Sequence, residues 1–457
     1  MAEQKEGFLK RMETQYYDYD IEHVPQEERK GTWSLIIVWF CWAFQFATII
    51  SGGVLASGLT LGESIWAIVI GDVILAIFAV IMSNIGLREG IGFSLQTRYS
   101  FGKRATVIPS FIAGCVQLGW LFFCYWIFAN VFQVMLTLIS PGWGTAGFFI
   151  GMIVCTIITV VPVVYGYEGP KWVAYITVFF LIVPIVYLIF VLLSSAGGLS
   201  KVAATYQPKQ HNSFVFGITL VIGAWIFGST TSADWIRLGK NKWALLAPVI
   251  GLVVGESLVL ILAAVTVAAT GGATWNAIEA TMKLGPFFGV VACIMYLCAM
   301  WDTQAPTAWS ASLQFANVFW RPKTLFAIIL SFLAPVLAIL IQYSTGAFNF
   351  MNGWLQALAA IMPAVGGILA CEYYIINRMK KYPEVTTLKR SVNLVAFLVW
   401  ILAAGFDYWT TTLCKAAGSG VGIKYGIPGV NGFIVALILY WIIMNIVKKA
   451  NPAWAEY

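Results

Sequence analysis

The chain has 457 residues, of which 60% are hydrophobic and 10% are charged, and its mean hydropathy is +0.83. Ordinary soluble domains carry about 25% charged residues, so this composition excludes a soluble protein and indicates a polytopic membrane protein. The formal net charge is +7. The distribution of that charge along the chain carries information about membrane topology.

The first 31 residues are polar and lack a short apolar core that ends in a small-residue cleavage site, so no cleavable signal peptide is predicted. We expect these residues to form a solvated cytoplasmic tail. The only two histidines, His23 and His211, fall outside the apolar runs. Proton chemistry inside the membrane would therefore have to use carboxylates.

Apolar runs long enough to cross a bilayer, about 20 residues each, recur from the tail to the C-terminus. We predict an all-α fold with twelve transmembrane helices, near 33–58, 65–87, 106–139, 145–166, 171–195, 213–236, 243–270, 285–315, 324–342, 347–376, 391–412 and 427–447. An even number of spans places both termini on one side of the membrane.

The basic residues test that topology, because cytoplasmic loops carry the excess of Lys and Arg. Five of the 27 basic residues fall on the side opposite the termini, namely Lys201, Lys209, Lys283, Lys415 and Lys424. The other 22 lie on the side of the termini. Both termini are therefore predicted to be cytoplasmic in an inner or plasma membrane, and the net charge requires no nucleic-acid partner.

Two spans are interrupted by small or helix-breaking residues near mid-depth. The interruptions are Ala47-Thr48-Ile49-Ile50-Ser51-Gly52-Gly53 in the first span and the stretch from Gly223 to Ser232 in the sixth. Glycine in a membrane helix is also compatible with simple close packing. Breaks at corresponding places in two halves favour a secondary transporter, whose binding site lies at the unwound midplane.

The span after each break contains a glycine followed by a carboxylate, Gly71-Asp72 in one half and Gly255-Glu256 in the other. Spans 1–5 and 6–10 therefore look like two copies of one unit. Because five is odd, the copies insert with opposite orientation and form an inverted repeat. We expect a tail at 1–31, a core at 32–412 with repeats at about 32–195 and 213–376, and a last helix with a short C-terminus at 413–457.

Asp302 lies in the middle of the eighth apolar run. A carboxylate at that depth costs roughly 2.5–3.5 kcal/mol on insertion scales, so such groups usually face a cavity and handle ions, protons or polar substrates. A neutral carboxyl bonded to a neighbouring helix is the structural alternative. Ala299, Asp302 and Thr303 share one helical face, and their oxygens suit a hard cation.

An aromatic shelf for a flat ligand is suggested by Gln117-Leu118-Gly119-Trp120 in the third span. Gln117 and Trp120 are three residues apart on one helical face, and Gly119 leaves room for close approach. Trp225 in the sixth span would close the other face of the ligand, since aromatic stacking contributes about 0.5–1.5 kcal/mol beyond area burial. Most tryptophans in membrane proteins are instead structural or interfacial.

Enzyme and channel functions find less support in the sequence. The eight cysteines show no Cys-x-x-Cys spacing, so neither disulfides nor a zinc site is predicted. No histidine lies within a span and no Ser-Lys or paired aspartate motif occurs at useful spacing, so we predict no enzyme. Rings of like charge, which a channel would show, do not occur either. We expect no cofactor.

Several longer motifs carry a resemblance to a known family. They are Arg98-Tyr99-Ser100-Phe101-Gly102, Gln117-Leu118-Gly119-Trp120, Thr231-Ser232-Ala233-Asp234-Trp235-Ile236-Arg237-Leu238-Gly239, Gln314-Phe315-Ala316-Asn317 and Met362-Pro363-Ala364-Val365-Gly366-Gly367. Through them the chain resembles the nucleobase-cation symporter family 1, from about Gly31 to Lys449. The resemblance implies a five-plus-five inverted repeat with broken helices 1 and 6, followed by two further helices.

The resemblance also implies roles for individual residues. The heterocycle would be held by Gln117, Gly119 and Trp120 of span 3, by Ala224 and Trp225 of span 6, and by the amide of Gln304 in span 8. The cation would be held by carbonyls of span 1 around Cys41 to Gln45 and, in span 8, by Ala299, Asp302 and Thr303.

The chain departs from the family pattern at four positions. Asp302 stands where a small hydroxyl residue is expected, and Gln304, Asp72 and Glu256 each replace an asparagine. An ionised Asp302 would strengthen cation binding, replace it by proton coupling, or pair with a basic group on the substrate. We favour a cation-coupling role for Asp302, and treat Asp72 and Glu256 as candidates for proton or polar coupling.

We therefore expect a symporter that imports a nucleobase such as cytosine, or a related planar nitrogenous heterocycle, coupled to sodium or protons by alternating access. Its partners would be the heterocyclic substrate, the coupling cation and the lipid bilayer, and the protein would act as a monomer. Two alternatives stay open. One is a transporter of the same fold for a cationic or vitamin-like compound with Asp302 as counter-charge, and the other is a non-transporting membrane receptor.

Overall fold

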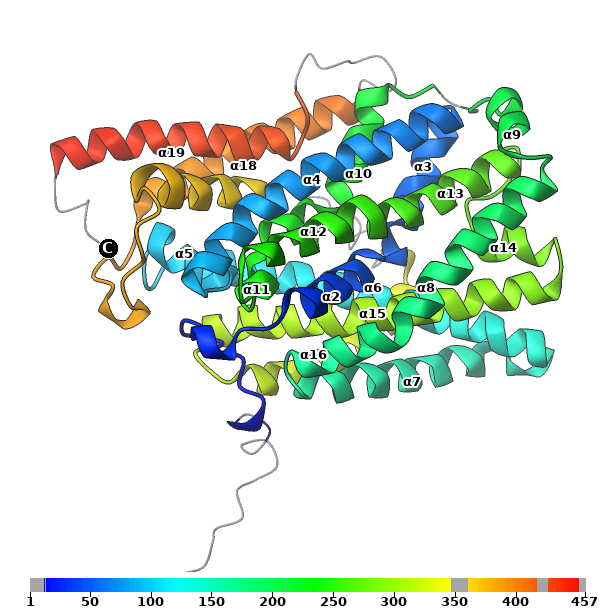
Figure 1. Cartoon of the computed structure of the whole chain (residues 1–457), viewed down its shortest axis with the longest axis horizontal. Helices are drawn as coiled ribbons and strands as arrows, with labels where there is room; N and C mark the ends of the chain where they lie inside the picture. Colours follow the sequence, from blue (N-terminus) through cyan, green and yellow to red (C-terminus); the bar gives the residue numbers. More distant parts are fainter. Residues whose placement is uncertain (1–11, 13, 210, 347–360, 417–425, 452–457) are drawn as a thin grey trace, which may run out of the picture.

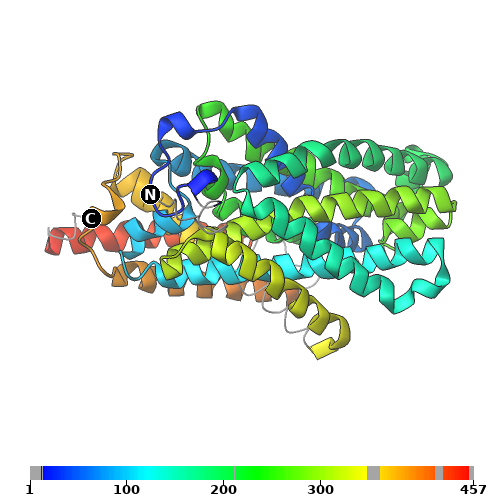
Figure 2. The same ribbon diagram turned by 90° about the horizontal axis from the view of Figure 1, so that it is seen from below.

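The computed structural model describes residues 12, 14–209, 211–346, 361–416 and 426–451. Within these ranges the regular structure is helical, and the only β pairing is an isolated bridge between Lys30 and Gly239. The long helices run side by side along the longest axis (Figure 1). The described N-terminal segment and the C-terminal end of α19 lie at the same end of the molecule (Figure 2), which we call the termini end.

Eleven helices in the described residues are long and apolar enough to cross a membrane. Their elements are α2 (Thr32–Ala43) with α3 (Ile49–Gly58), α4 (Leu61–Glu89), α6 (Val107–Ile139), α7 (Gly144–Val164), α8 (Glu168–Ser195), α10 (Phe214–Thr230) with α11 (Ala233–Ile236), α12 (Leu246–Ile250) with α13 (Ser257–Ala269), α15 (Pro286–Phe319), α16 (Lys323–Tyr343), α18 (Leu394–Ala416) and α19 (Val430–Ala450). The span predicted at 347–376 is described only as the shorter helix Ile361–Ile376, because residues 347–360 lie outside the described residues.

Local sequence explains where these helices begin and end. At the start of α4 the Thr60 hydroxyl accepts the backbone N–H of Glu63, while the Glu63 carboxylate accepts the Thr60 N–H, which forms a capping box. The same helix ends at Gly90, whose φ of 71° suits glycine. Shorter helices α5 (Phe93–Phe101), α9 (Leu199–Thr205) and α14 (Ala277–Met282) connect the long ones.

The first span is broken, as predicted, but the break lies earlier than the predicted stretch 47–53 and overlaps it only at Ala47 and Thr48. Helix α2 ends at Ala43, the chain is extended at Gln45, and α3 begins at Ile49 after a short 3-10 turn. Gly52 and Gly53 are therefore helical. A Cβ on Gly52 would lie 2.8 Å from the Leu260 carbonyl oxygen of α13, so this glycine permits close helix packing.

The break in the sixth span also lies later than its glycines suggested. Helix α10 is continuous to Thr230, and α11 begins at Ala233 after a turn at Thr231 and Ser232. Trp225, expected inside the break, lies in the regular helix instead. Gly228 leaves space for the Trp225 ring, whereas no atom lies within 4 Å of a Cβ built at Gly223.

A π-helix, η5 (Gly251–Glu256), joins α12 to α13 where α2 crosses it. A Cβ on Gly251 would lie 2.7 Å from the Trp39 carbonyl oxygen, and one on Gly255 would lie 2.8 Å from that of Phe40. These glycines let two backbones meet. π-helical turns are rare and frequently occur at functional sites.

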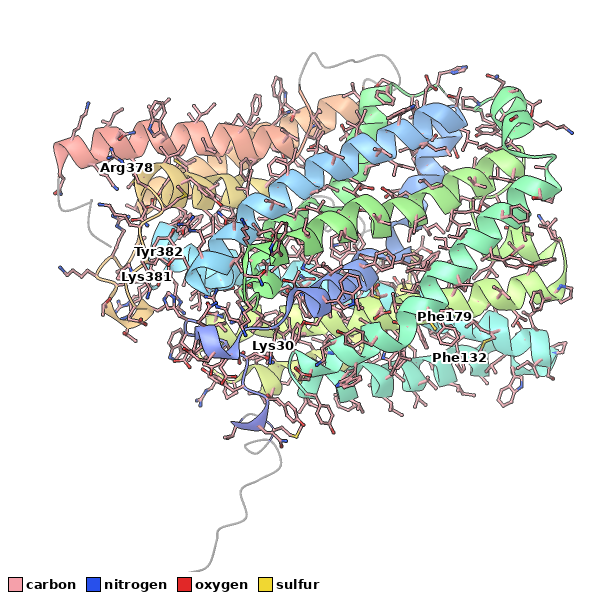
Figure 3. The ribbon with its side chains drawn as sticks, in the orientation of Figure 1. Lys30, Phe132, Phe179, Arg378, Lys381 and Tyr382 are labelled. Carbon is pink, nitrogen blue, oxygen red and sulfur yellow. The ribbon has the colours of Figure 1, made fainter. Side chains whose placement is uncertain are left out.

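Outward-facing apolar side chains cover the long helices, and Phe179 of α8, for example, is 64% exposed (Figure 3). Basic side chains such as Lys30, Arg378 and Lys381 lie toward the termini end (Figure 3). Residues 14–30 do not form the expected solvated tail. They pack against the helix ends, and the carboxylates of Asp18 and Asp20 are buried there.

Candidate functional site

A narrow cavity lies where the break between α2 and α3 faces α6, α10 and α15. Its volume is about 20 Å³, which has room for about one water molecule. The lining residues come from four distant parts of the chain, namely Trp42, Gln45, Gln117, Trp120, Ala224, Trp225, Phe227, Gly228 and Thr307. A planar heterocycle would require this cavity to widen.

The structure brings together four of the residues expected to hold a heterocycle: Gln117, Trp120, Ala224 and Trp225 all line the cavity. Gly119 is buried in α6 and is not among the lining residues. The two helices that carry these side chains, α6 and α10, both reach this cavity. Spans 3 and 6 therefore each contribute a wall of one cavity, and their binding of a heterocycle stays a prediction.

One aromatic wall contains tryptophans that the sequence interpretation missed. The ring of Trp225 lies 5.2 Å from that of Trp42 in an edge-to-face arrangement and 6.2 Å from that of Trp39. The indole N–H of Trp42 donates a hydrogen bond of 3.2 Å to the Thr307 hydroxyl of α15. The sequence did contain a signal for these two residues, because Trp39 and Trp42 lie three positions apart and so share one face of the helix.

Polar groups at the cavity form a chain toward the termini end. The Gln117 amide donates to the Ser310 hydroxyl at 3.2 Å, and that hydroxyl donates to the Asp234 carboxylate at 3.1 Å. Asp234 also accepts the Phe93 backbone N–H at 2.7 Å and the Gln314 amide at 2.5 Å. These bonds hold the Gln117 amide in a defined orientation. The side-chain oxygen of Gln117 takes no part in this series of hydrogen bonds.

Gln304 does not line the cavity. Its amide oxygen accepts hydrogen bonds from the Cys155 thiol and the Thr159 hydroxyl of α7, both at 3.0 Å. The two residues are three positions apart on α15, so periodicity alone would place them near one face. The contacts of Gln304 with α7 separate the two side chains. Thr307 is the α15 side chain that reaches the cavity.

The residues expected to bind a cation lie in part around Asp302. The Cys41 thiol lies next to the Asp302 carboxyl and donates to the Ala174 carbonyl at 3.6 Å. Asp302 is 1% exposed, and within the described residues neither of its oxygens accepts a hydrogen bond. A buried carboxyl without partners is costly, so this position is the strongest candidate for an ion or proton.

The other expected cation ligands are arranged differently. The Thr303 hydroxyl donates to the Ala299 carbonyl at 2.8 Å, so these two oxygens bond each other. The Gln45 side chain turns to the cavity, and its amide lies 3.9 Å from the Cys124 sulfur. The Gln45 backbone carbonyl accepts the Thr48 hydroxyl at 2.7 Å.

Asp72 and Glu256, which occupy corresponding places in the two repeats, meet between α4 and η5. Both are fully buried and their carboxyl groups contact each other. The Ser257 hydroxyl donates to Asp72 at 2.5 Å, while both Glu256 oxygens lack a hydrogen-bond partner in the described part of the chain. Two adjacent buried carboxyls repel each other when both are ionised. Neither residue lines the cavity between α6, α10 and α15.

Membrane-length helices, two of them broken, and a buried cavity of indoles and amides beside the breaks define a membrane transporter. A family model described as permease for cytosine/purines, uracil, thiamine and allantoin matches residues 23–443. The chain belongs to this family, the nucleobase-cation symporter family 1.

Relatives and solved structures agree with that membership. The chain is 27% identical to cytosine permease of Escherichia coli (strain K12), over 94% of this chain and 95% of that protein. It is 24% identical to hydantoin permease of Microbacterium maritypicum, over 94% of this chain and 89% of that protein. It shares its fold with Mhp1 in a closed conformation with bromovinylhydantoin bound, at a TM-score of 0.79 and 22% identity over 94% of this chain and 96% of the other.

Proposed function

We propose that the protein imports a nucleobase such as cytosine, or a related planar nitrogenous heterocycle, by cation-coupled alternating access. The observation that carries this proposal is the convergence of Trp120, Trp225 and Gln117 on one cavity, which we call the heterocycle cavity. Indoles offer flat apolar faces to a ring, and a primary amide offers both a donor and an acceptor to its polar edge. Membership of a family of permeases for such compounds supports the same substrate class.

The experiment that tests the site is binding of labelled cytosine, uracil and hypoxanthine to the purified protein. Gln117→Ala and Trp120→Ala should each abolish saturable binding, because each removes a wall or polar contact of the cavity. Gln304→Ala is the matched control, since its amide faces α7, and it should bind with near wild-type affinity. Full binding in both cavity variants would refute the site.

Coupling is proposed to involve Asp302, through sodium or a proton. The carboxyl lies on α15 beside Cys41 of α2, so it joins a helix of the first repeat to one of the second. Binding measured with and without sodium, at about pH 6 and pH 8, would separate the two ions. Tightening by sodium that is lost in Asp302→Asn indicates sodium coupling, whereas dependence on pH alone indicates a proton.

A buried carboxylate in α18 supplies the control for that substitution. Asp407 accepts the backbone N–H groups of Gly429 at 2.8 Å and Gly432 at 3.1 Å. Asn keeps a carbonyl oxygen that accepts these bonds. Asp407→Asn should therefore leave the sodium and pH dependence of binding unchanged.

One observation favours a second candidate function. Asp302 has no basic partner among the described residues, so it is available as the counter-charge of a cationic substrate. The family description includes thiamine, which is a cationic vitamin. Competition by amidines or thiamine, but not by neutral bases, would favour this function.

The termini end is proposed to face the cytoplasm. The argument is the loop asymmetry, with 22 of the 27 basic residues on that side. In alternating access the first two spans of each repeat, α2 to α4 and α10 to α13, would rock as a bundle against α6, α7, α8, α15 and α16. Labelling of a tag on either terminus in intact and in permeabilised cells tests the orientation.

A further inference from the structure

Residues 14–30, which we call the N-terminal strap, cross the termini end before α2 begins (Figure 1). The strap is fixed to one group of helices through Asp18, whose side chain is 7% exposed. The Asp18 carboxylate pairs with the Lys323 ammonium of α16 and accepts the Trp309 indole N–H of α15 at 2.8 Å. It also accepts the Tyr167 backbone N–H, just before α8, at 3.2 Å.

Asp20 extends this attachment. Its carboxylate accepts the Lys323 backbone N–H at 3.3 Å, and its backbone carbonyl accepts the Asn317 amide at 3.0 Å. The strap therefore holds α15, α16 and the start of α8, all of which belong to the part of the molecule outside the rocking bundle.

The same strap is bound to the bundle on its other side. The Tyr19 carbonyl accepts the Arg237 guanidinium at 2.8 Å, directly after α11. The Val24 N–H donates to the Gly90 carbonyl at the end of α4 at 2.9 Å. Lys30 exchanges backbone hydrogen bonds with Leu238 and Lys240, of 2.6 Å and 3.0 Å.

Tyr19 is the residue at which the strap passes from one group of helices to the other. Its φ is 56°, a left-handed conformation that is uncommon for a residue with a Cβ. Asp18 and Asp20 on either side of it are anchored to α15 and α16, while its own carbonyl is anchored to Arg237. Contacts from both groups hold this backbone conformation.

A second, smaller cavity shows how closely the strap seals this end. Its volume is about 10 Å³, and Asp20 of the strap forms part of its wall with Asp234, Arg237 and Asn317. This is room for no more than about one water. A passage from the heterocycle cavity to the termini end would have to cross this contact between strap, α11 and α15.

The electrostatics of Asp18 favour a docked strap at neutral pH. Burial by itself would raise the pKa of the Asp18 carboxyl, but the Lys323 ammonium and the Trp309 N–H outweigh it, so its pKa lies below the usual value. Asp18 is therefore ionised at neutral pH. Removal of one partner of a buried ion pair leaves an uncompensated charge and is strongly destabilising.

We propose that the N-terminal strap is a latch that ties α4 and α11 to α15 and α16, and that it must release on one side before the path at the termini end opens. The inference rests on the alternating-access part of the proposed function. Asp18 and Lys323 are its positioning residues, because they hold the strap without lining the heterocycle cavity.

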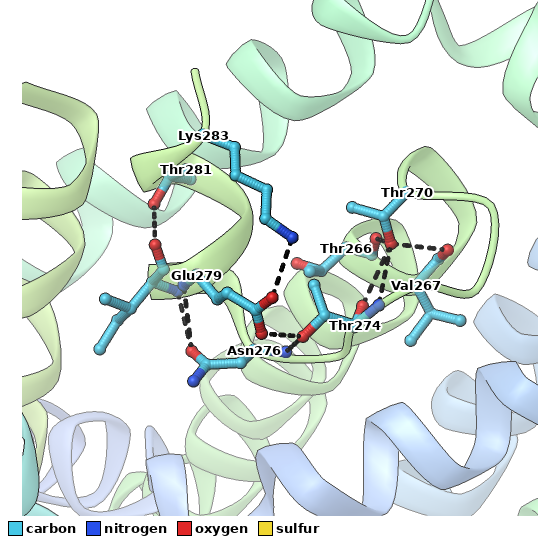
Figure 4. A network of polar contacts seen from close by, with 9 residues as sticks. Thr266, Val267, Thr270, Thr274, Asn276, Glu279, Thr281 and Lys283 are labelled. Carbon is cyan, nitrogen blue, oxygen red and sulfur yellow. Dashed lines mark hydrogen bonds and ion pairs between the residues drawn. The ribbon is translucent and has the colours of Figure 1, made fainter. Parts of the chain in front are cut away.

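Hydrogen–deuterium exchange of the full chain in nanodiscs tests the latch without any substrate. Lys323→Gln should raise the exchange rate of amides in residues 14–24 at least tenfold, and that of residues 309–319 of α15 severalfold. Lys283→Gln is the matched control. It breaks the ion pair between Lys283, directly after α14, and Glu279 of α14, whose nitrogen and oxygen lie 2.9 Å apart (Figure 4). The two side chains are 63% and 52% exposed. Loss of this pair should change the exchange of neither segment.

Asp18→Asn is the second variant, because it removes the charge and keeps an acceptor for the Trp309 N–H. It guards against a Lys323→Gln protein that fails to fold. Faster exchange in both the strap and α15 supports the latch. Faster exchange in the strap alone, or in neither segment, overturns it, since the strap would then cover the helices without holding them. This result is independent of whether labelled cytosine binds.

Discussion

Replacing Gly228 by Ala should displace the Trp225 ring that lines the heterocycle cavity. A Cβ at this position would lie 2.4 Å and 2.6 Å from two carbons of the indole, whereas ordinary contact begins at 3.4 Å. The ring must therefore move by about 1 Å, the difference between 3.4 and 2.4 Å. Because Trp42 and Trp39 pack against it, the movement is resisted.

Overpacking of this kind costs about 1–3 kcal/mol. At 1.4 kcal/mol per factor of ten, the full cost expressed in binding would weaken the Kd for cytosine by about 5- to 150-fold. Any part of this free energy that does not weaken binding should destabilise the folded protein and lower its thermal unfolding temperature. The assay is equilibrium binding to the purified protein, combined with a thermal unfolding scan of the same sample.

Gly223→Ala is the matched control on the same helix. No atom lies within 4 Å of a Cβ built at Gly223, and both variants gain the same helix propensity, about 1 kcal/mol. The difference between the two variants therefore measures the clash alone. If Gly228→Ala matched Gly223→Ala in both Kd and unfolding temperature, the Trp225 position and the reasoning from it would be refuted.

Two further predictions concern the strap and the packing of α19. Burial raises the pKa of the Asp20 carboxyl despite the nearby Lys323 ammonium. Because the pKa of Asp20 is higher in the docked strap, docking is most favourable when the pH lies below the pKa of the free carboxyl, about 3.9. Docking weakens as the pH rises through the pKa of the docked carboxyl. Asp20→Asn should remove this pH dependence from the hydrogen exchange of residues 14–24. If the exchange of the variant still depended on pH, a group other than Asp20 would be responsible. Gly367→Ala should lower stability by about 1–3 kcal/mol or more, because its Cβ would lie 2.1 Å from the Phe433 carbonyl oxygen. Thermal unfolding measures this, and Gly405→Ala, which meets no atom within 4 Å, should be close to wild type.

Much of the architecture could be predicted from the sequence because hydropathy is a local property. Runs of about 20 apolar residues indicate a membrane span wherever they lie in the fold. Eleven of the predicted spans have a counterpart among the membrane-length helices of the described residues. The shelf of Gln117 and Trp120 was visible for the same reason, since two side chains three residues apart share a helix face.

The positions of the helix breaks were not predictable from glycine content. Gly52, Gly53 and Gly228 all lie in regular helix. A glycine inside a membrane helix either interrupts it or admits a neighbour, and the sequence of one helix does not say which. The packing partner decides, as the Leu260 carbonyl against Gly52 shows.

Contacts between residues far apart in the chain required the tertiary structure. The sequence by itself determined a membrane transporter fold with a candidate indole and amide shelf and isolated buried carboxyls. Only the folded chain decided that Thr307 and not Gln304 faces the cavity, that Asp72 meets Glu256, and that Asp18 reaches Lys323, 305 residues away. Helix periodicity specifies which residues share a face, whereas the partner of each face follows from how all the helices pack together.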